Sequence, residues 1–309
     1  MERGIFTGAT EASWKPLGKV DFPDKKSRHL DFDRVTAYLQ EGQAIFNDWE
    51  IGQREAAAIV EAPYKNLPIV VGLFSDIHYG SINVNYELLT EHLEIVENTP
   101  NFYMATNGDH ADLFNAIKFS SGMEEDPISP QIQARAIMER LRQLDDKGKI
   151  LVLSHGNHDD FGELAGQDFY DSFLSKFHAP IFTSGGLLHI MVQGQEYKVL
   201  LNHTYWGKSK LNVTNAAKRL MEYEGGGNID IAWLGHTHQS SYEHFERGGK
   251  DVLAVVSGTY KTRDDWAAKR GIGGRGQQPG ICVMLWPKER KMQAFKDIKV
   301  AQEVIKGWV

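Results

Sequence analysis

Five short polar clusters in this chain carry side chains of the kinds that bind divalent cations. Carboxylates, imidazoles and an amide recur in them without a thiolate, a donor set that suits Mn²⁺, Fe or Zn²⁺ and argues against copper(I) or an iron–sulfur cluster. A pair of such cations could activate water for attack on a phosphate ester. The clusters are Asp76-Ile77-His78, Gly108-Asp109, Gly156-Asn157-His158-Asp159, Asn202-His203 and Gly235-His236-Thr237-His238.

Each cluster follows a short run rich in Val, Ile, Leu and aromatic residues, the composition of a buried strand. In layered α/β folds, the loops that leave the carboxyl ends of neighbouring strands meet at one edge, and ligand sites collect there. We therefore expect the five clusters to converge. The predicted strands are 68–75, 101–107, 149–154, 197–201 and 229–234.

The spacing of the clusters predicts strands that alternate with helices. Successive clusters are roughly 30 to 50 residues apart, which is long enough for one return connection between strands. Helical periodicity appears between them, over 86–96, 131–144 and 211–223. After His238 the pattern changes to two further predicted strands, 252–257 and 281–286.

Two of the clusters hold pairs of ligand-type residues in the same spacing. Asp76 and His78 are two residues apart, as are His236 and His238, so on an extended chain the members of each pair leave on the same side. Gly235 allows a close approach of the backbone at the second pair. Each motif alone is common among ordinary surface or core residues. The full set in this order is unlikely to arise by chance.

In that order the motifs read DxH, GD, GNHD, H and GHxH, and over about residues 68–240 the chain resembles the calcineurin-like metallophosphoesterase superfamily. The resemblance implies an α/β fold, a two-layered mixed β-sandwich flanked by helices, and two divalent metal ions. Mn²⁺ is the expected metal, with Fe, Zn²⁺ or Ni²⁺ as alternatives. By position, one ion would be bound by Asp76, His78, Asp109 and His238, and the other by Asp109, Asn157, His203 and His236.

The same resemblance implies the catalytic residues. His158 would donate a proton to the leaving oxygen, a task for which imidazole suits because it titrates near neutrality. Asp159 would orient His158. Three other histidines lie near the clusters in sequence and are either neighbours of the ligands or solvent-facing, namely His110, His155 and His244.

The residues of two motifs indicate the class of substrate. The phosphoprotein-phosphatase branch of the superfamily carries GDxVDRG and GNHE, whereas this chain has GDHADLF at 108–114 and GNHDD at 156–160, without that arginine. The GNHD form looks more like the nuclease and phosphodiesterase branches. We therefore expect a phosphodiesterase or nuclease acting on DNA, RNA or nucleotides. The alternatives are a phosphomonoesterase for nucleotides or small phosphates, and a non-catalytic module that keeps the metals as a scaffold.

Two further segments suggest phosphate contacts. The polar, glycine-rich loop 259–280 is either a phosphate-binding segment or a solvated loop; its basic residues are Lys261, Arg263, Lys269, Arg270 and Arg275, with Trp266 among them. Gly207-Lys208-Ser209 resembles the end of a nucleotide-binding loop. Because Asn202 stands where that pattern needs glycine, we do not predict a nucleotide triphosphatase.

Composition sets broad limits. With 41% hydrophobic residues the chain can bury a sizeable core, and its net charge of −7 provides no global attraction to nucleic acid. The single cysteine, Cys282, excludes an internal disulfide framework. We see neither a signal-peptide pattern nor an apolar run of about 18 residues. These features predict a cytoplasmic protein without a membrane segment.

The chain divides by composition near residue 60. Residues 1–60 are expected to form an N-terminal arm that lies on the main domain, with an amphipathic stretch over 32–49. From Ala57 onward the core is expected to begin, with an edge strand before the strand that ends at Asp76. Residues 61–309 are expected to form the metallophosphoesterase domain, including the loop 259–280. The aromatics of the arm are interpreted as packing anchors: Trp14, Tyr38, Phe46 and Trp49.

Overall fold

The computed structural model describes residues 32–114, 125–159, 176–263, 268 and 279–308, without the side chains of 45–53. The chain divides into two units, Met1–Asp48 and Trp49–Val309. Helix α1 (Phe32–Arg54) runs across this boundary. Tyr38 on α1 is 76% exposed, whereas Trp14 and the side chains of Phe46 and Trp49 lie outside the described residues. The packing of the arm on the main domain stays a prediction.

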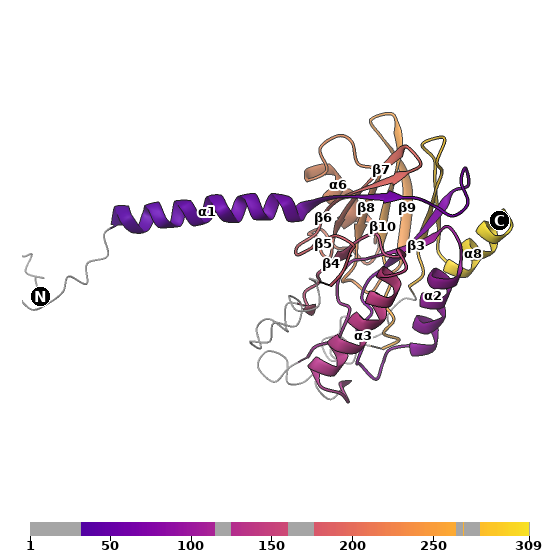
Figure 1. The fold of residues 1–309 in the computed structure, drawn as a ribbon, viewed down its shortest axis with the longest axis horizontal. Helices are drawn as coiled ribbons and strands as arrows, with labels where there is room; N and C mark the ends of the chain where they lie inside the picture. The colour runs from indigo at the N-terminus through magenta and orange to yellow at the C-terminus, as the bar shows by residue number, and fades with distance from the viewer. Residues whose placement is uncertain (1–31, 115–124, 160–175, 264–267, 269–278, 309) are drawn as a thin grey trace, which may run out of the picture. The chain divides into compact units, whose positions relative to one another are not determined.

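Among its described residues, the larger unit contains a six-stranded sheet, a four-stranded sheet and a short two-stranded pair (Figure 1). Within its described residues, one sheet has the strand order β1-β6-β7-β8-β10-β9 and the other β12-β11-β2-β3. The first comprises β1 (Glu55–Val60), β6 (Gly186–Val192), β7 (Gln195–Asn202), β8 (Ile231–Leu234), β10 (Lys250–Val256) and β9 (Ser241–Arg247). The second comprises β12 (Met292–Phe295), β11 (Cys282–Leu285), β2 (Ile69–Phe74) and β3 (Phe102–Thr106).

A short parallel pair adds to the edge of the second sheet. It consists of β4 (Leu153–Ser154) and β5 (Ile181–Phe182). A bridge between Met104 in β3 and Ile150 joins the segment before β4 to the sheet. The chain before the GNHD motif therefore lies beside β3, as the predicted strand 149–154 requires.

The two sheets pack face to face, because alternate residues of each strand point to opposite sides. In β2, Val71 and Leu73 belong to the core between the sheets, while Val70 and Phe74 belong to the core on the outer side. Trp233 of β8 is fully buried between the sheets, and its indole Nε1 donates to Ser257 Oγ at 2.6 Å.

Helices cover the outer faces of both sheets (Figure 1). Three of them pack on the second sheet, namely α2 (Tyr86–Asn98), α3 (Pro130–Asp145) and α8 (Ile298–Lys306), and α6 (Asn215–Tyr223) packs on the first. Helix α2 begins where the side chain of Asn85 accepts from Leu88 N at 3.0 Å, and it buries Leu89, Leu93 and Val96 at helical spacing. The expected two-layered mixed β-sandwich flanked by helices is confirmed.

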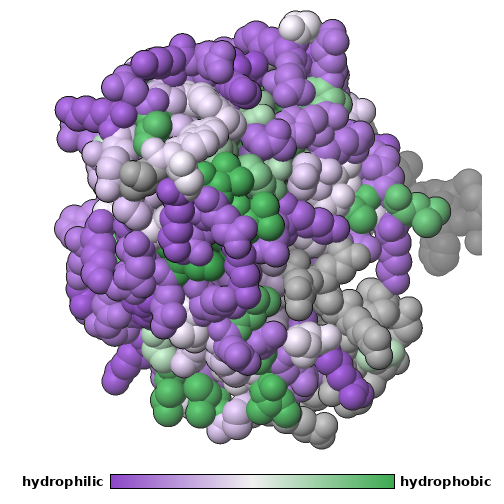
Figure 2. Space-filling model, turned by 90° about the vertical axis from the view of Figure 1, so that its right-hand side faces the viewer, coloured by the Kyte–Doolittle hydropathy of each residue, from purple (hydrophilic) through white to green (hydrophobic). Residues whose placement is uncertain are grey.

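The surface seen in Figure 2 is dominated by hydrophilic residues, among which apolar residues form small separate patches. Among the described helices, none is both long enough and apolar enough to cross a membrane.

Strand direction brings the polar clusters to one edge. β2 runs parallel to β3, and β7 runs parallel to β8. Their carboxyl ends precede the clusters at Asp76, Asp109, His203 and His236, so the loops that follow converge. Backbone hydrogen bonds connect them directly: Asp76 N donates to Gly108 O at 3.1 Å, and Gly235 N donates to His203 O at 3.0 Å.

Gly108 and Gly156 let two of these loops touch backbone to backbone. Gly108 has φ +80°, and a Cβ there would lie 2.5 Å from Gly156 Cα. A Cβ on Gly156 would lie 2.5 Å from Asp109 N. Real Cβ atoms do not approach backbone so closely, so the GD and GNHD motifs need glycine to hold their neighbouring side chains this near each other.

Replacing Gly108 with alanine should therefore destabilise the fold. Both the left-handed backbone and the overlap with Gly156 disfavour the Cβ, and we expect a loss of about 2 kcal/mol in the free energy of unfolding, measured by urea denaturation. Gly227→Ala is the matched control, because a Cβ there meets nothing within 4 Å. Equal midpoints for the two variants would contradict the argument.

Candidate metal centre

The loops that carry the proposed ligands adopt an unusual backbone. Five of these residues have φ in the left-handed region: Asp76 (52°), His78 (50°), Asp109 (53°), His236 (67°) and His238 (55°). Each such conformation costs on the order of 1 kcal/mol in a residue with a Cβ, and such strain clusters at functional sites. The packing and hydrogen bonds of the surrounding loops must hold these residues in place.

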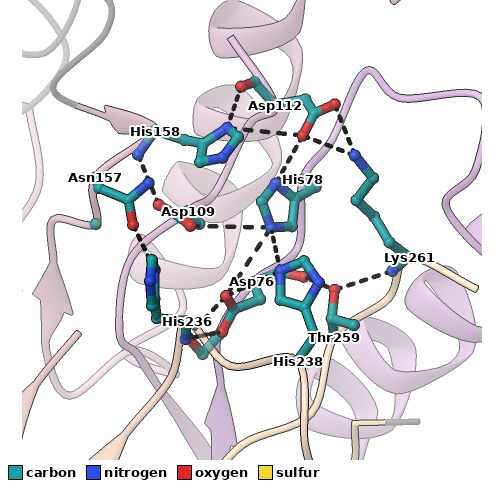
Figure 3. A network of polar contacts seen from close by, with 12 residues as sticks. Asp76, His78, Asp109, Asp112, Asn157, His158, His236, His238, Thr259 and Lys261 are labelled. Atoms are coloured by element: carbon teal, nitrogen blue, oxygen red, sulfur yellow. Dashed lines mark hydrogen bonds and ion pairs between the residues drawn. The ribbon is translucent and has the colours of Figure 1, made fainter. Parts of the chain in front are cut away.

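The first group of side chains surrounds Asp76 (Figure 3). His78 Nε2 lies 3.0 Å from His238 Nε2, and His238 Nε2 lies 3.4 Å from Asp76 Oδ1. Asp76 and His78 are fully buried. Because His78 Nδ1 donates to Asp112 Oδ1 at 2.7 Å, the Nε2 atom of a neutral His78 presents a lone pair to the group.

The second group comprises Asp109, His203 and His236, and a third group of Asp109, His78 and His158 links it to the first. Asp109 Oδ2 lies 3.0 Å from His203 Nε2 and 3.9 Å from His78 Nε2. His236 Nδ1 donates to Asn157 Oδ1 at 2.7 Å. The structure thus brings together all seven side chains expected as ligands, with Asp109 placed between the two groups.

The electrostatics of both groups favour ionised carboxylates. Burial by itself would raise the pKa of Asp76, but His238 and His203 outweigh it and lower the pKa to about 2. Burial would likewise lower the pKa of His203, yet Asp109 outweighs it and raises the pKa to about 10. For His236, burial and then the charge of His203 lower the pKa to about 4. Without a metal, a protonated His203 supplies positive charge to the ionised Asp109, and a bound cation would take the place of that proton.

The donor set fits divalent cations. His203 Nδ1 donates to Asn107 O at 2.6 Å, so its Nε2 carries the lone pair in the neutral ring. That buried Nε2 has no hydrogen-bond partner, although it points at the Asp109 carboxylate. Two acceptors facing each other repel unless a proton or a cation lies between them, and a cation bound by oxygen and imidazole satisfies both.

Asp112 was not identified from the sequence, although it lies only three residues after Asp109. Its carboxylate accepts from His78 Nδ1 and pairs with Lys261 Nζ at 3.1 Å. Lys261 also pairs with Glu125 at 3.1 Å. A carboxylate behind a ligand histidine fixes the ring tautomer and its orientation. We therefore infer that Asp112 positions His78. Lys261 neutralises the carboxylates of Asp112 and Glu125.

This placement corrects the interpretation of Lys261 as a substrate-binding residue. It is 2% exposed and lies behind the centre (Figure 3). The reason is charge: the buried carboxylates of Asp112 and Glu125 need a cation, and Lys261 supplies it. Arg263 is exposed, while Lys269, Arg270, Arg275 and Trp266 of the same loop lie outside the described residues.

His158 lies beside the first group. Its Nδ1 donates to the backbone oxygen of Asp112, its backbone N donates to Asp109 Oδ1 at 2.8 Å, and its ring centroid is 4.6 Å from that of His78. Phe114 contacts the ring from another side, at 4.9 Å between centroids. The described contacts that orient His158 thus come from the 109–114 loop.

Asp159, which the sequence suggested as the orienting residue, has a different set of described contacts. Its Oδ2 accepts from Asp109 N at 2.9 Å and from Gly156 N at 2.7 Å, and its Oδ1 accepts from His110 N at 3.2 Å. These bonds lock the GD and GNHD loops together. The geometry therefore favours Asp112 over Asp159 for orienting His158.

The three neighbouring histidines fall in different places. His110 contacts Asp159 through Nδ1 and Thr106 Oγ1 through Nε2, so it supports the loop that carries Asp109. His155 is buried directly after β4. His244 lies on β9 and its Nδ1 donates to Asp251 at 3.1 Å, outside the groups around Asp76 and Asp109.

Among solved structures, the chain is similar to a nuclease from Pseudomonas putida, nuclease MPE. The two chains are 12% identical, the match covers 73% of this chain and 87% of the nuclease, and the TM-score is 0.32. We base no argument on so distant a likeness. Comparison with curated proteins finds no significant match.

The family is shown by a different comparison. The sequence profile of the calcineurin-like phosphoesterases matches residues 69–240, more than half of the 309 residues. That range holds the two groups of side chains around Asp76 and Asp109, together with His158. The chain therefore belongs to the calcineurin-like phosphoesterase family, and it is a metal-dependent phosphoester hydrolase.

Proposed function

We propose that the enzyme cleaves phosphodiesters and acts on nucleic acid or nucleotides. The observation that carries the proposal is Leu113, which stands where the phosphoprotein-phosphatase motif has its arginine and is fully buried. The dianion of a phosphomonoester gains from such a cation, whereas a diester carries one charge fewer. Phe114 follows and packs on His158, so neither Leu113 nor Phe114 brings a positive charge to the centre.

We further propose that the centre holds two ions, with Mn²⁺ as the native metal. Asp109 would bridge them. When bound, the ions would activate a water molecule and neutralise the phosphoryl oxygens. One would be held by Asp76, His78, Asp109 and His238, and the other by Asp109, Asn157, His203 and His236.

His158 is the proposed general acid. Because its Nδ1–H is engaged by the backbone oxygen of Asp112, the proton for the leaving oxygen must come from Nε2, and the ring must be an imidazolium before cleavage. After transfer the ring is neutral, with its lone pair on Nε2. Asp112 keeps this tautomer fixed through its backbone, while its carboxylate holds His78.

Substitution of His158 with asparagine should separate catalysis from metal binding. The variant should bind Mn²⁺ as the wild type does, by calorimetry, and lose about 10²- to 10⁴-fold in kcat, the usual contribution of a general acid. His244→Asn is the control and should retain full turnover, since it lies outside the centre. Unchanged turnover in the His158 variant would support a non-catalytic or differently catalysed centre.

A substrate panel distinguishes the candidate reactions. With Mn²⁺ added, we expect hydrolysis of a chromogenic phosphodiester and of DNA that exceeds hydrolysis of the matching monoester. Chelation should abolish activity, and renewed Mn²⁺ should restore it, because the ligands supply no nucleophile of their own. Turnover of the monoester alone would refute the proposed substrate class and favour the phosphomonoesterase alternative.

Asp112→Asn should weaken metal binding although Asp112 is not a proposed ligand. Loss of a carboxylate behind a ligand histidine typically costs about 10- to 100-fold in metal affinity, measured here by calorimetry with Mn²⁺. Asp145→Asn is the matched control: Asp145 is also buried, but it accepts from His178 N and Ala179 N. If both variants bound Mn²⁺ with the affinity of the wild type, the positioning role of Asp112 would be wrong.

A further inference from the structure

We propose that the segment Thr204–Lys208, with Trp206 at its centre, is a nucleobase subsite that binds one unpaired base of a single-stranded nucleic acid next to the scissile phosphate. We call it the Trp206 subsite. The inference rests on the proposed function and makes it more specific, since it selects single strands among the phosphodiesters. It also gives a role to the Gly207-Lys208-Ser209 sequence, which is not a nucleotide-triphosphatase motif.

The Trp206 subsite is a hollow in the surface directly after a proposed metal ligand. Thr204 to Lys208 line a shallow, open hollow, and His203 immediately precedes them. Trp206 is 53% exposed. Trp206 lies three residues after the proposed ligand His203, and an aromatic side chain this exposed is available for contact with a substrate.

The position of Trp206 is fixed by helix α6. Arg219 Cζ lies 4.4 Å from the centroid of the Trp206 ring, and the ring of Tyr223 lies 5.3 Å away at an interplanar angle of 33°. Asn215 Nδ2 donates to Gly207 O at 2.7 Å. Gly207 has φ +89°, and a Cβ there would lie 2.5 Å from Arg219 Cδ, so glycine is required for this packing.

Lys208 supplies positive charge beside Trp206. It lines the same hollow as Trp206, its side chain is exposed, and it lies five residues after the proposed ligand His203. An exposed ammonium at this place can contact a backbone phosphate while the neighbouring base reaches Trp206.

The chemistry of the Trp206 subsite suits an unpaired base joined to a phosphate. Every base has a π-face that stacks on an aromatic side chain, whereas the bases of a duplex already stack on each other. Lys208 and Arg219 add positive charge for the backbone in a chain whose net charge is −7, so the attraction to a polyanion is local here. Glu224, which accepts from Tyr205 Oη at 2.9 Å, gives the hollow one acidic edge.

The test measures the binding of fluorescent oligonucleotides to the Mn²⁺-loaded His158→Asn protein by anisotropy. The probes are a short oligothymidylate, the same oligomer with abasic units, and a duplex. Adding Trp206→Leu should raise Kd for the oligothymidylate by about tenfold or more, the usual effect of losing one base–aromatic stack. It should leave Kd for the abasic oligomer and for the duplex unchanged. Trp206→Phe should restore most of the affinity.

Two controls separate stacking from charge and from general damage. Lys208→Gln should raise Kd for the oligothymidylate and for the abasic oligomer by similar factors. It should also reduce the salt dependence of binding, because it removes a phosphate contact. Trp308→Leu should leave Kd for all three probes unchanged. Trp308 is also exposed, at 45%, and it contacts Trp286. Trp286 follows β11, which ends beside the start of β2, at the opposite end of β2 from Asp76.

The outcomes also separate this inference from the proposed function. If the otherwise wild-type enzyme cleaves the chromogenic diester and the oligothymidylate, but Trp206→Leu changes KM equally for the oligothymidylate and its abasic form, the Trp206 subsite is wrong and the phosphodiesterase remains. If Trp206→Leu weakens duplex binding as much as single-strand binding, the preference for unpaired bases is wrong. If the enzyme cleaves no diester, the proposed function fails and the Trp206 subsite fails with it.

Discussion

The structure depends on the close approach of buried acceptors at one edge of a β-sandwich. Asp109 Oδ2 lies 3.0 Å from His203 Nε2, and two imidazole Nε2 atoms, those of His78 and His238, are also 3.0 Å apart. In a site of low dielectric such an arrangement is unfavourable without positive charge. Cations satisfy it, so the same geometry that would destabilise a metal-free core gives the enzyme its affinity for metals.

The surrounding fold overcomes both this repulsion and the strain of the backbone. The parallel strands β2, β3, β7 and β8 direct their carboxyl ends to one edge, Gly108 and Gly156 allow the loops to touch, and Asp159 ties those loops together through backbone N–H groups. Behind His78 stands the buried chain Asp112–Lys261–Glu125. The strands, the glycines and the buried ion pairs together hold the proposed ligands in place, although none of them is itself a proposed ligand.

The strands before the polar clusters could be predicted from the sequence, because segments such as 68–75 combine an apolar run with a polar end. The set of ligand-type residues could be predicted because the order of the motifs is specific to one superfamily. Strand β6 was missed because the Gln193-Gly194 turn that joins it to β7 is a weak hairpin signal, even though both residues have positive φ. Helix α8 was missed because it has only nine residues, although its buried residues Ile298, Ala301 and Ile305 recur at helical spacing. Strand β9 is largely polar and is held mainly by its pairing with β10.

Contacts between residues distant in the sequence explain what was missed at the site. Asp112 reads as an ordinary loop residue until His78 and Lys261 are seen around it, and Lys261 lies 149 positions away. The most direct test of the account is the number of Mn²⁺ ions bound per chain, measured by elemental analysis after gel filtration. We predict two ions for the wild type and none retained by Asp109→Asn, since Asp109 serves both groups. An active wild-type preparation without metal would contradict the account.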